Sequence, residues 1–555
     1  MKENFGFSKE KNNCSGDFFS KNSITFLISF LVIGIIIRLN YFPFDIPFEQ
    51  DALDFFEYAV KTKNSGMIPH DWFLANNGWS LFLATFFSFI HLDTFLDYVH
   101  LQRILSIIIS VITIVPVYFF CKKFFDEKTA LIGGALFIFN PFIIDSSLLA
   151  GTHTIFIFTG IIAFYFFLRD SPKSTYISFA VLGVLAVIRY EGLILLIPFT
   201  ILYFIKFRNE SKYFLKYVIS LSFFLIIILP FSIIDLNNFG EDGLVSNIFS
   251  NLKHVDKHII QEEYSGDNWT DEIEGNVSSN FVLKGFENIF KFLGFGLFPI
   301  LLFLVPYGIF KIFKNIDQQK LFIIAISVTL LIPAFYAYAR DFQDIKFLLI
   351  MYPIFSLLSL YIIEKIYHVT TKTNAIIIIL LFIIIISSII ILEINKIDYE
   401  YERDSFIVAN KVVEISEGYL VYSPESRYIK SAEAELKWPD VLPNNKDGHV
   451  IRDKTLRFKI DFSENNLSWK YNLGEETFSS KKFETLYELF SSLEQEGLTH
   501  IIIDEKENRA KFLSEAFLNP KKFPFLKEVY NSSSEQLSYN VKIFEVHYNK
   551  LEPGI

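Results

Sequence analysis

Four carboxylates lie close together in the stretch FEQDALDFFEYA, which covers residues 48–59 and follows an apolar run long enough to span a bilayer. They are Glu49, Asp51, Asp54 and Glu57. Placing a carboxylate near hydrocarbon costs free energy, so the position of these four at a membrane boundary needs a chemical explanation.

A helical conformation places Asp51, Asp54 and Tyr58 on one face, because positions i, i+3 and i+7 share a side of a helix. A carboxylate of this face, Asp51 or Asp54, can then take the proton of an acceptor hydroxyl as a general base. The same carboxylates can instead hold a divalent metal, with Glu49 and Asp51 as ligands. An amphipathic loop that merely keeps its acids in water is the alternative interpretation.

Basic residues near the ends of later apolar runs are candidates to bind an anionic group of a substrate. They are Arg103, Arg189, Arg340 and Lys346. A single Arg at a helix end usually reaches the lipid headgroups and does no more. Four on the same side as the acidic stretch, where Lys and Arg are otherwise few, favour binding of a phosphate.

The composition predicts a membrane protein. Of 555 residues, 52% are hydrophobic and 17% aromatic, which is too apolar for a soluble chain of this length. The net charge of -10 and the absence of a basic face exclude a nucleic-acid partner. With only two cysteines, Cys14 and Cys121, neither a disulfide framework nor a thiolate metal site is expected.

Eleven apolar runs approach the roughly 20 residues that a spanning helix needs. They cover residues 22–40, 101–121, 128–147, 153–168, 174–189, 190–207, 214–234, 287–311, 320–339, 346–366 and 373–393. A further piece, 79–92, is short for a span. We expect a juxtamembrane helix there, because the basic clusters between spans then share one side with the basic N-terminus.

The charge distribution predicts a multi-pass protein of the cell membrane with a cytoplasmic N-terminal tail, 1–21. The transmembrane domain, 22–393, includes two acidic outer loops, 41–100 and 235–286. The first run lacks a small-residue cleavage pattern and is interpreted as an uncleaved anchor.

Residues 396–555 are expected to form an extracytoplasmic α/β domain. Helical stretches such as SFIVANKVVEIS and KKFETLYELFSSLEQEG alternate there with the strand-like pieces GYLVYS, THIIID and VKIFEV.

Signatures of several other functions are missing. The chain has no GxxxxGK[ST], no complete GxGxxG after a strand, no HExxH, no paired CxxC and no GxSxG. The sequence therefore gives no support for an ATP-driven pump, a zinc hydrolase or a serine hydrolase.

The ordered motifs resemble the GT-C glycosyltransferases, in particular archaeal and bacterial relatives of protein O-mannosyltransferases and aminoarabinose transferases. Asp51, Ala52 and Ala59 fall on that family's DE-x-x-Y-x-x-x-A pattern, where Ala52 replaces the second acid and Phe55 the Tyr. RILSIIISVITIVPVYFFCKKFF and ALIGGALFIFNPFIIDSS are similar to its second and third spans. RYEG at 189–192 is similar to a recurrent turn, and DIKFLLIMYP resembles E-x-R-F-L-L-P-x-x-P, with Lys346 in place of the Arg.

The resemblance implies a GT-C-like fold and transfer of a monosaccharide from a polyprenyl- or dolichyl-phosphate donor. It implies a single inverting displacement onto a protein, lipid or glycan acceptor at the outer face, with Asp51 as the base. The cations would neutralise the departing lipid phosphate. No cofactor is expected, although a divalent metal remains possible.

Oligosaccharyltransferases of the same class use a metal and a Trp-Trp-Asp motif in the outer domain. The nearest stretch here, Lys437-Trp438-Pro439-Asp440, does not match it, so transfer of a whole oligosaccharide is disfavoured. A polytopic lipid or sugar transporter or flippase is the main alternative. It predicts repeats and ionisable residues in mid-span, neither of which is evident. A membrane-anchored sensor would need fewer spans.

Overall fold

The structure is a computed structural model, and it describes most of the membrane part and portions of the C-terminal part. The described residues are 19, 22–48, 50–70, 72–74, 76–248, 277–314, 316–340, 342–369, 373–415, 419–422, 428, 431, 432, 434, 435, 438, 457–461, 468–473, 476, 477, 485–494, 498–505 and 511–551.

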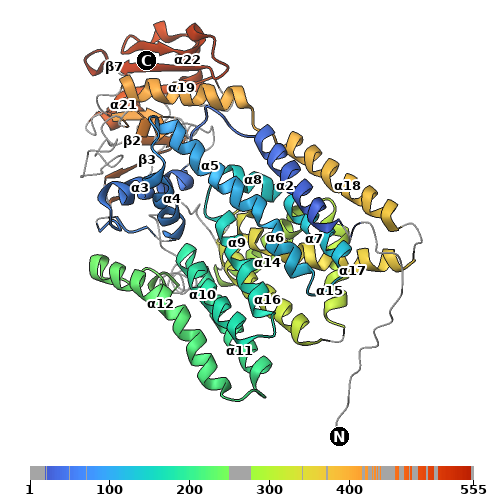
Figure 1. The fold of residues 1–555 in the computed structure, drawn as a ribbon. Coiled ribbons are helices and arrows are strands. Elements are labelled where there is room, and N and C mark those ends of the chain that lie inside the picture. The colour runs from blue at the N-terminus through green and yellow to red at the C-terminus, as the bar shows by residue number, and fades with distance from the viewer. Residues whose placement is uncertain are drawn as a thin grey trace.

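A helical bundle forms the larger part of the molecule, and a β-sheet region lies at one end of it (Figure 1). The helices of the bundle are α2 (Ser23–Asn40), α5 (Phe95–Ile112), α6 (Ile114–Cys121), α7 (Glu127–Ile138), α8 (Pro141–Leu148), α9 (His153–Phe167), α10 (Pro172–Ile188), α11 (Leu196–Phe207), α12 (Tyr213–Phe239), α14 (Val277–Leu297), α15 (Leu301–Ile312), α16 (Gln318–Ala339), α17 (Tyr352–Val369) and α18 (Thr373–Ile394). Two 3-10 helices, η1 (Tyr190–Leu195) and η2 (Ile345–Met351), lead directly into α11 and α17.

The helices confirm a multi-pass membrane protein, but the expected count of eleven spans is not confirmed. Among the described residues, seven helical segments are long and apolar enough to cross a membrane, and nine if each of two bent pairs is one span. The helices at 153–167 and 172–188 are apolar but shorter.

Both bent pairs break at a proline. α7 and α8 meet at 48°, where Asn140 Oδ1 accepts hydrogen bonds from the amides of Phe142 and Ile143 and Pro141 opens the new helix. The expected span at 287–311 consists of two helices at 114°, with Pro299 between them. Proline lacks the amide that would continue the helix, which explains both positions.

A buried arginine joins the bent α7–α8 pair to its neighbours. Arg38 of α2 is inaccessible, and its guanidinium donates to Ser147 Oγ at 3.1 Å, Ser110 Oγ at 3.0 Å and the carbonyls of Gly34 and Ile138. Ile138 ends α7, so a cation meets the negative end of that helix dipole. The break is therefore stabilised from two neighbouring helices, α2 and α5.

The 41–100 loop contains two helices, α3 (Gln50–Ser65) and α4 (Gly78–Phe89), that lie between the bundle and the sheet (Figure 1). The helix expected around Asp51 and the short helix expected at 79–92 are both present. On α3, Asp51 is exposed and Asp54 half-buried, whereas Tyr58 is buried with its ring 5.5 Å from that of Trp72. Burial raises the pKa of the Tyr58 phenol. The expected polar face thus ends before Tyr58.

The C-terminal part confirms the expected α/β region. Its seven strands are β1 (Tyr419–Tyr422), β2 (Arg457–Asp461), β3 (Ser468–Leu473), β4 (Glu476–Thr477), β5 (Leu498–Asp504), β6 (Leu526–Asn531) and β7 (Val541–Val546). Their order in the sheet is β4-β3-β2-β1-β5-β7-β6, with β1 parallel to β2 and β5 and the other pairs antiparallel. The helices are α19 (Tyr399–Ile415), α21 (Leu486–Leu493) and α22 (Lys511–Leu518).

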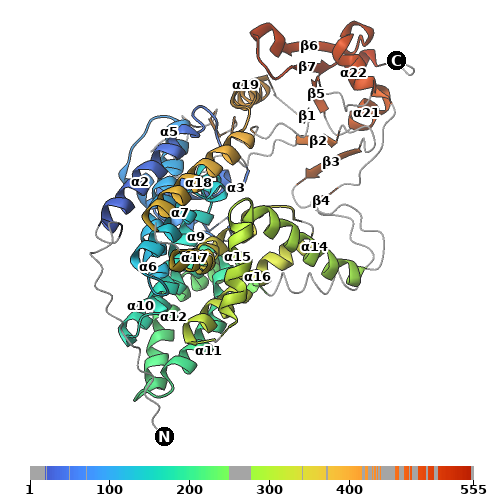
Figure 2. The same cartoon turned by 90° about the vertical axis from the view of Figure 1, so that its right-hand side faces the viewer.

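Two described residues between β1 and β2, Ser431 and Trp438, contact the 41–100 loop. Helix α19 lies between the bundle and the sheet (Figure 2). Trp438 is 5% exposed, with its ring 5.4 Å from Tyr98 and 5.8 Å from both Phe56 and Phe95. Ser431 Oγ donates to the carbonyl of Phe48 at 2.9 Å. The C-terminal part therefore contacts the loop that carries Asp51.

Candidate active site

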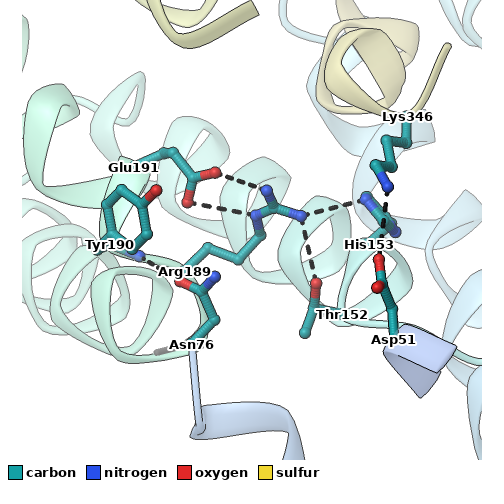
Figure 3. Close-up of polar contacts among 8 residues, drawn as sticks. All are labelled: Asp51, Asn76, Thr152, His153, Arg189, Tyr190, Glu191 and Lys346. Carbon is teal, nitrogen blue, oxygen red and sulfur yellow. Dashed lines mark hydrogen bonds and ion pairs between the residues drawn. The ribbon is translucent and has the colours of Figure 1, made fainter. Parts of the chain in front are cut away.

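Asp51 of α3 and Lys346 of η2 form an ion pair, although 295 positions separate them in the sequence. Lys346 Nζ lies 3.4 Å from Asp51 Oδ2 (Figure 3). It also lies 3.4 Å from Asp344 Oδ2. The Asp51 side chain is 79% exposed and that of Lys346 is 36% exposed. Ion pairs this open to solvent contribute about 1 kcal/mol or less, so a ligand can displace them at small cost.

Arg189 forms a second, more buried cluster beside the first. Its guanidinium binds Glu191 through two hydrogen bonds, Nε to Oε2 at 3.3 Å and Nη2 to Oε1 at 2.5 Å (Figure 3). Nη1 lies 3.3 Å from Thr152 Oγ1 and 3.1 Å from His153 Nε2. A guanidinium only donates, so His153 Nε2 accepts and the neutral ring carries its proton on Nδ1.

Close backbone packing explains the RYEG sequence at this turn. Arg189 is extended, with φ at −148°, and its carbonyl accepts the amide of Gly192 at 2.8 Å. A Cβ on Gly192 would lie 2.9 Å from the amide nitrogen of Ala186, so the turn folds back too tightly for a side chain there.

The 41–100 loop packs against the same turn. Asn76, with φ at 65°, accepts the amide of Tyr190 through Oδ1 at 3.0 Å. A Cβ on Gly78 would lie 2.8 Å from the Cα of Ile188. The loop that carries Asp51 is thus fixed against the turn that carries Arg189.

A cavity lies between these clusters. Four polar residues line it: His153, Arg189, Glu191 and Lys346. The apolar lining residues are Phe156, Ile157, Leu330, Pro333, Ala334, Phe347, Leu349 and Ile350. A lining that combines two cations with hydrocarbon side chains suits an amphiphile with an anionic head.

The structure places the other predicted cations away from this cavity. Arg103 is 4% exposed, and its guanidinium donates to the carbonyls of Leu148, Pro43, Ile46 and Pro47. Arg340 lies over the rings of Tyr336 and Phe342, at 5.7 and 5.4 Å. Neither is among the described residues that line the cavity, and phosphate binding by them stays a prediction.

Replacement of Arg103 by Met is expected to destabilise the fold by at least about 3 kcal/mol, because each buried carbonyl that loses its donor costs about 1–3 kcal/mol. Cys121 is buried and free, so its reaction with a maleimide dye during heating, in a Cys14→Ser background, reports unfolding. Exposed Arg169→Met is the matched control. Equal unfolding midpoints for the two variants would show that Arg103 does not hold the loop.

Sequence reasoning missed Thr152, His153 and Asn76. The triplet Gly151-Thr152-His153 interrupts two apolar runs, and this polar break was the available signal. No sequence signal indicated Asn76, because only folding brings it next to Tyr190.

Metal ligation by Glu49 and Asp51 cannot be placed, since Glu49 lies outside the described residues. Within the described part of the chain, no group of three or more His, Cys, Asp or Glu side chains is arranged to hold a metal. The ion-pair partner of Asp51 there is the ammonium of Lys346, which repels a metal ion. Metal binding by Glu49 and Asp51 therefore stays an untested prediction.

The protein is a polytopic membrane protein with the GT-C fold, as the sequence resemblance predicted. A sequence profile of the family described as dolichyl-phosphate-mannose-protein mannosyltransferase matches residues 95–234. No curated protein matches the chain.

Two solved structures support the same class. The oligosaccharyltransferase of Archaeoglobus fulgidus in its apo form is 12% identical with a TM-score of 0.50, over 88% of this chain and 70% of that one. ArnT from Cupriavidus metallidurans, bound to undecaprenyl phosphate, is 9% identical with a TM-score of 0.50, over 96% of this chain and all of that one. The likeness in structure shows the fold, and with the family profile it supports a glycosyltransferase.

Proposed function

We propose that this chain transfers a monosaccharide from a polyprenyl- or dolichyl-phosphate donor to a hydroxyl acceptor at the outer face of the membrane. The observation that carries the proposal is a cavity lined by Arg189, Lys346 and apolar side chains, with Asp51 paired to Lys346. The ArnT structure of similar fold contains undecaprenyl phosphate, a ligand of the proposed class.

The reaction is a single displacement at the anomeric carbon. The acceptor oxygen forms the new bond while the bond to the phosphate oxygen breaks, and that oxygen keeps the electron pair. The hydroxyl proton goes to the carboxylate of Asp51, which acts as general base. The configuration at the anomeric carbon is inverted, and the products are the glycosylated acceptor and the lipid monophosphate.

The two cations have different parts in this scheme. Arg189 is held by Glu191, Thr152 and His153, so it offers a fixed positive charge to the phosphate. Lys346 is more exposed and moves from Asp51 to the phosphate when the donor binds. That exchange stabilises the charge that grows on the leaving group and frees Asp51 for the acceptor proton.

The acceptor is a protein, a lipid or a glycan, and transfer of a whole oligosaccharide to Asn remains disfavoured. Trp438 stands nearest to the Trp-Trp-Asp motif in sequence, but its ring is packed against Phe56, Phe95 and Tyr98. Its indole nitrogen donates to the carbonyl of Asp93 at 3.3 Å. The Trp438 side chain is thus packed and hydrogen-bonded within this chain.

The outer-face location follows from the proposed topology. The acidic loops 41–100 and 235–286 and residues 396–555 lie outside, and the basic clusters and tail 1–21 lie in the cytoplasm. Residues 22–393 then act as the transmembrane domain and residues 396–555 as a separate extracytoplasmic α/β domain.

The test is label transfer by the full chain in lipid nanodiscs, supplied with a panel of radiolabelled polyprenyl-phosphate monosaccharides and crude outer-face acceptors. We expect one donor of the panel to give labelled acceptor, and EDTA to leave its rate unchanged. Donor binding without turnover across the panel would overturn the proposal in favour of a lipid flippase. Absence of binding would point to a sensor.

A further inference from the structure

One buried amide joins the two halves of the candidate site. Gln102 of α5 is inaccessible to solvent, and its Nε2 donates to the carbonyl of Ala52 at 3.3 Å and to that of Ala150 at 3.0 Å. Ala52 follows Asp51 directly in α3, and Ala150 lies two residues before Thr152. A single side chain therefore ties the helix of the carboxylate to the turn that leads to Arg189.

The carbonyl of Ala150 is held from a second direction as well. Trp79 Nε1, on the buried face of α4, donates to it at 3.0 Å. Ala150 has φ at 56°, a left-handed conformation that an alanine keeps only where its surroundings impose it. The two donors supply that constraint, and they hold the α8–α9 turn in the form that brings Thr152 and His153 to Arg189.

The chemistry of the amide suits this position. One amide nitrogen carries two hydrogens and can bond two carbonyls at once, whereas a glutamate at the same place only accepts. The two carbonyls also have other donors. Trp79 bonds Ala150, and Ala52 lies in the first turn of α3, where the helix provides a donor four residues on. Loss of the amide thus loosens the connection without leaving either carbonyl unsatisfied.

We propose that Gln102 is a positioning residue for the transfer reaction, which sets the distance between the Asp51 carboxylate and the Arg189 cluster. The proposal rests on the proposed function. Gln102 is not among the described residues that line the cavity, so it acts through the backbone of α3 and of the α8–α9 turn.

The test compares Gln102→Leu and Gln102→Glu with Ser178→Ala in nanodiscs. Ser178 is a matched control because its buried hydroxyl also bonds a backbone carbonyl, that of Ala163 at 2.7 Å, in the contact between α10 and α9. Both Gln102 variants are expected to lower kcat by about 10- to 100-fold, since small misplacements of reacting groups have effects of this size. KM for the donor should stay within about twofold, because the cavity residues are intact.

Hydrogen exchange followed by mass spectrometry supplies a readout that does not need turnover. In Gln102→Leu we expect exchange to rise about tenfold in residues 51–56 and 149–153, the two tethered segments, and to stay unchanged elsewhere. The unfolding midpoint should equal that of Ser178→Ala.

The outcomes separate the two proposals. An unchanged kcat, or unchanged exchange in both segments, overturns the role of Gln102. A rise in KM that accounts for the whole loss also overturns it. Absence of transfer by the wild type with increased exchange in Gln102→Leu would mean that the tether exists but the transferase function does not, so the proposed role in catalysis would fail with it.

Discussion

Asp51→Asn is expected to lower the rate of sugar transfer by about 10²- to 10⁴-fold, the range that a general base contributes. The amide keeps the size of the carboxylate but cannot take the acceptor proton. Donor binding should remain, because Arg189 and Lys346 are unchanged and the ion pair of Asp51 with Lys346 is exposed. The measurement is initial rate and donor affinity in nanodiscs.

Asp93→Asn is the matched control, since Asp93 is an exposed carboxylate in the same 41–100 loop. It should transfer at the wild-type rate. Asp54→Asn completes the set, because Asp54 lies one helical turn from Asp51 and is the alternative base. A full rate in Asp51→Asn together with a loss in Asp54→Asn would move the base to Asp54.

Lys346→Met is expected to weaken donor binding and transfer together, by about 10- to 100-fold. A hydrogen bond to a charged group contributes about 1.5–3 kcal/mol, and the departing phosphate gains charge as the bond breaks. Lys346→Arg should keep most of the activity, because a guanidinium also neutralises a phosphate and the similar family pattern has Arg there. Steady-state kinetics over a range of donor concentrations separate the effects on KM and kcat.

Lys291→Met is the control for charge loss alone. Lys291 is an exposed lysine of α14 whose Nζ donates to Gln343 Oε1 at 3.2 Å, and it is not among the described residues that line the cavity. Equal losses in Lys346→Met and Lys291→Met would mean that general surface charge, not contact with the donor phosphate, explains the effect.

The sequence was sufficient to predict the helical membrane class and three of the groups that the structure brings together. Asp51 was identified because carboxylates are costly at a membrane boundary. Arg189 and Lys346 were identified because cations were scarce on that side. Hydropathy and charge act locally along the chain, so a single sequence reveals them.

Arg103 shows why the sequence could not tell which of the four predicted cations line the cavity. The position of an arginine at a helix end does not reveal which way its guanidinium turns. Here it turns toward the backbone of the 41–100 loop, and its carbonyl partners lie 45 to 60 positions away in the sequence. The same limit hid the connection of Gln102 to Ala52 and Ala150.

Helix geometry was predicted less well than helix existence. Apolar length placed helices at 128–147 and 287–311, but it did not reveal the bends of 48° and 114° inside them. Those bends depend on Pro141 and Pro299 together with packing partners such as Arg38, which a hydropathy window does not register. The role of His153 depended in turn on the α8–α9 turn that follows the first bend.

The most direct test of the central claim is the identity of the lipid product. Full-length protein in nanodiscs is incubated with a polyprenyl-phosphate monosaccharide and acceptor, and the lipid is analysed by mass spectrometry for wild type and Asp51→Asn. We predict acceptor-dependent release of polyprenyl monophosphate by the wild type and a loss of about 10² or more in the variant. Failure of the wild type to release lipid phosphate, or equal release by both proteins, would contradict the assignment of this cavity and this carboxylate to sugar transfer.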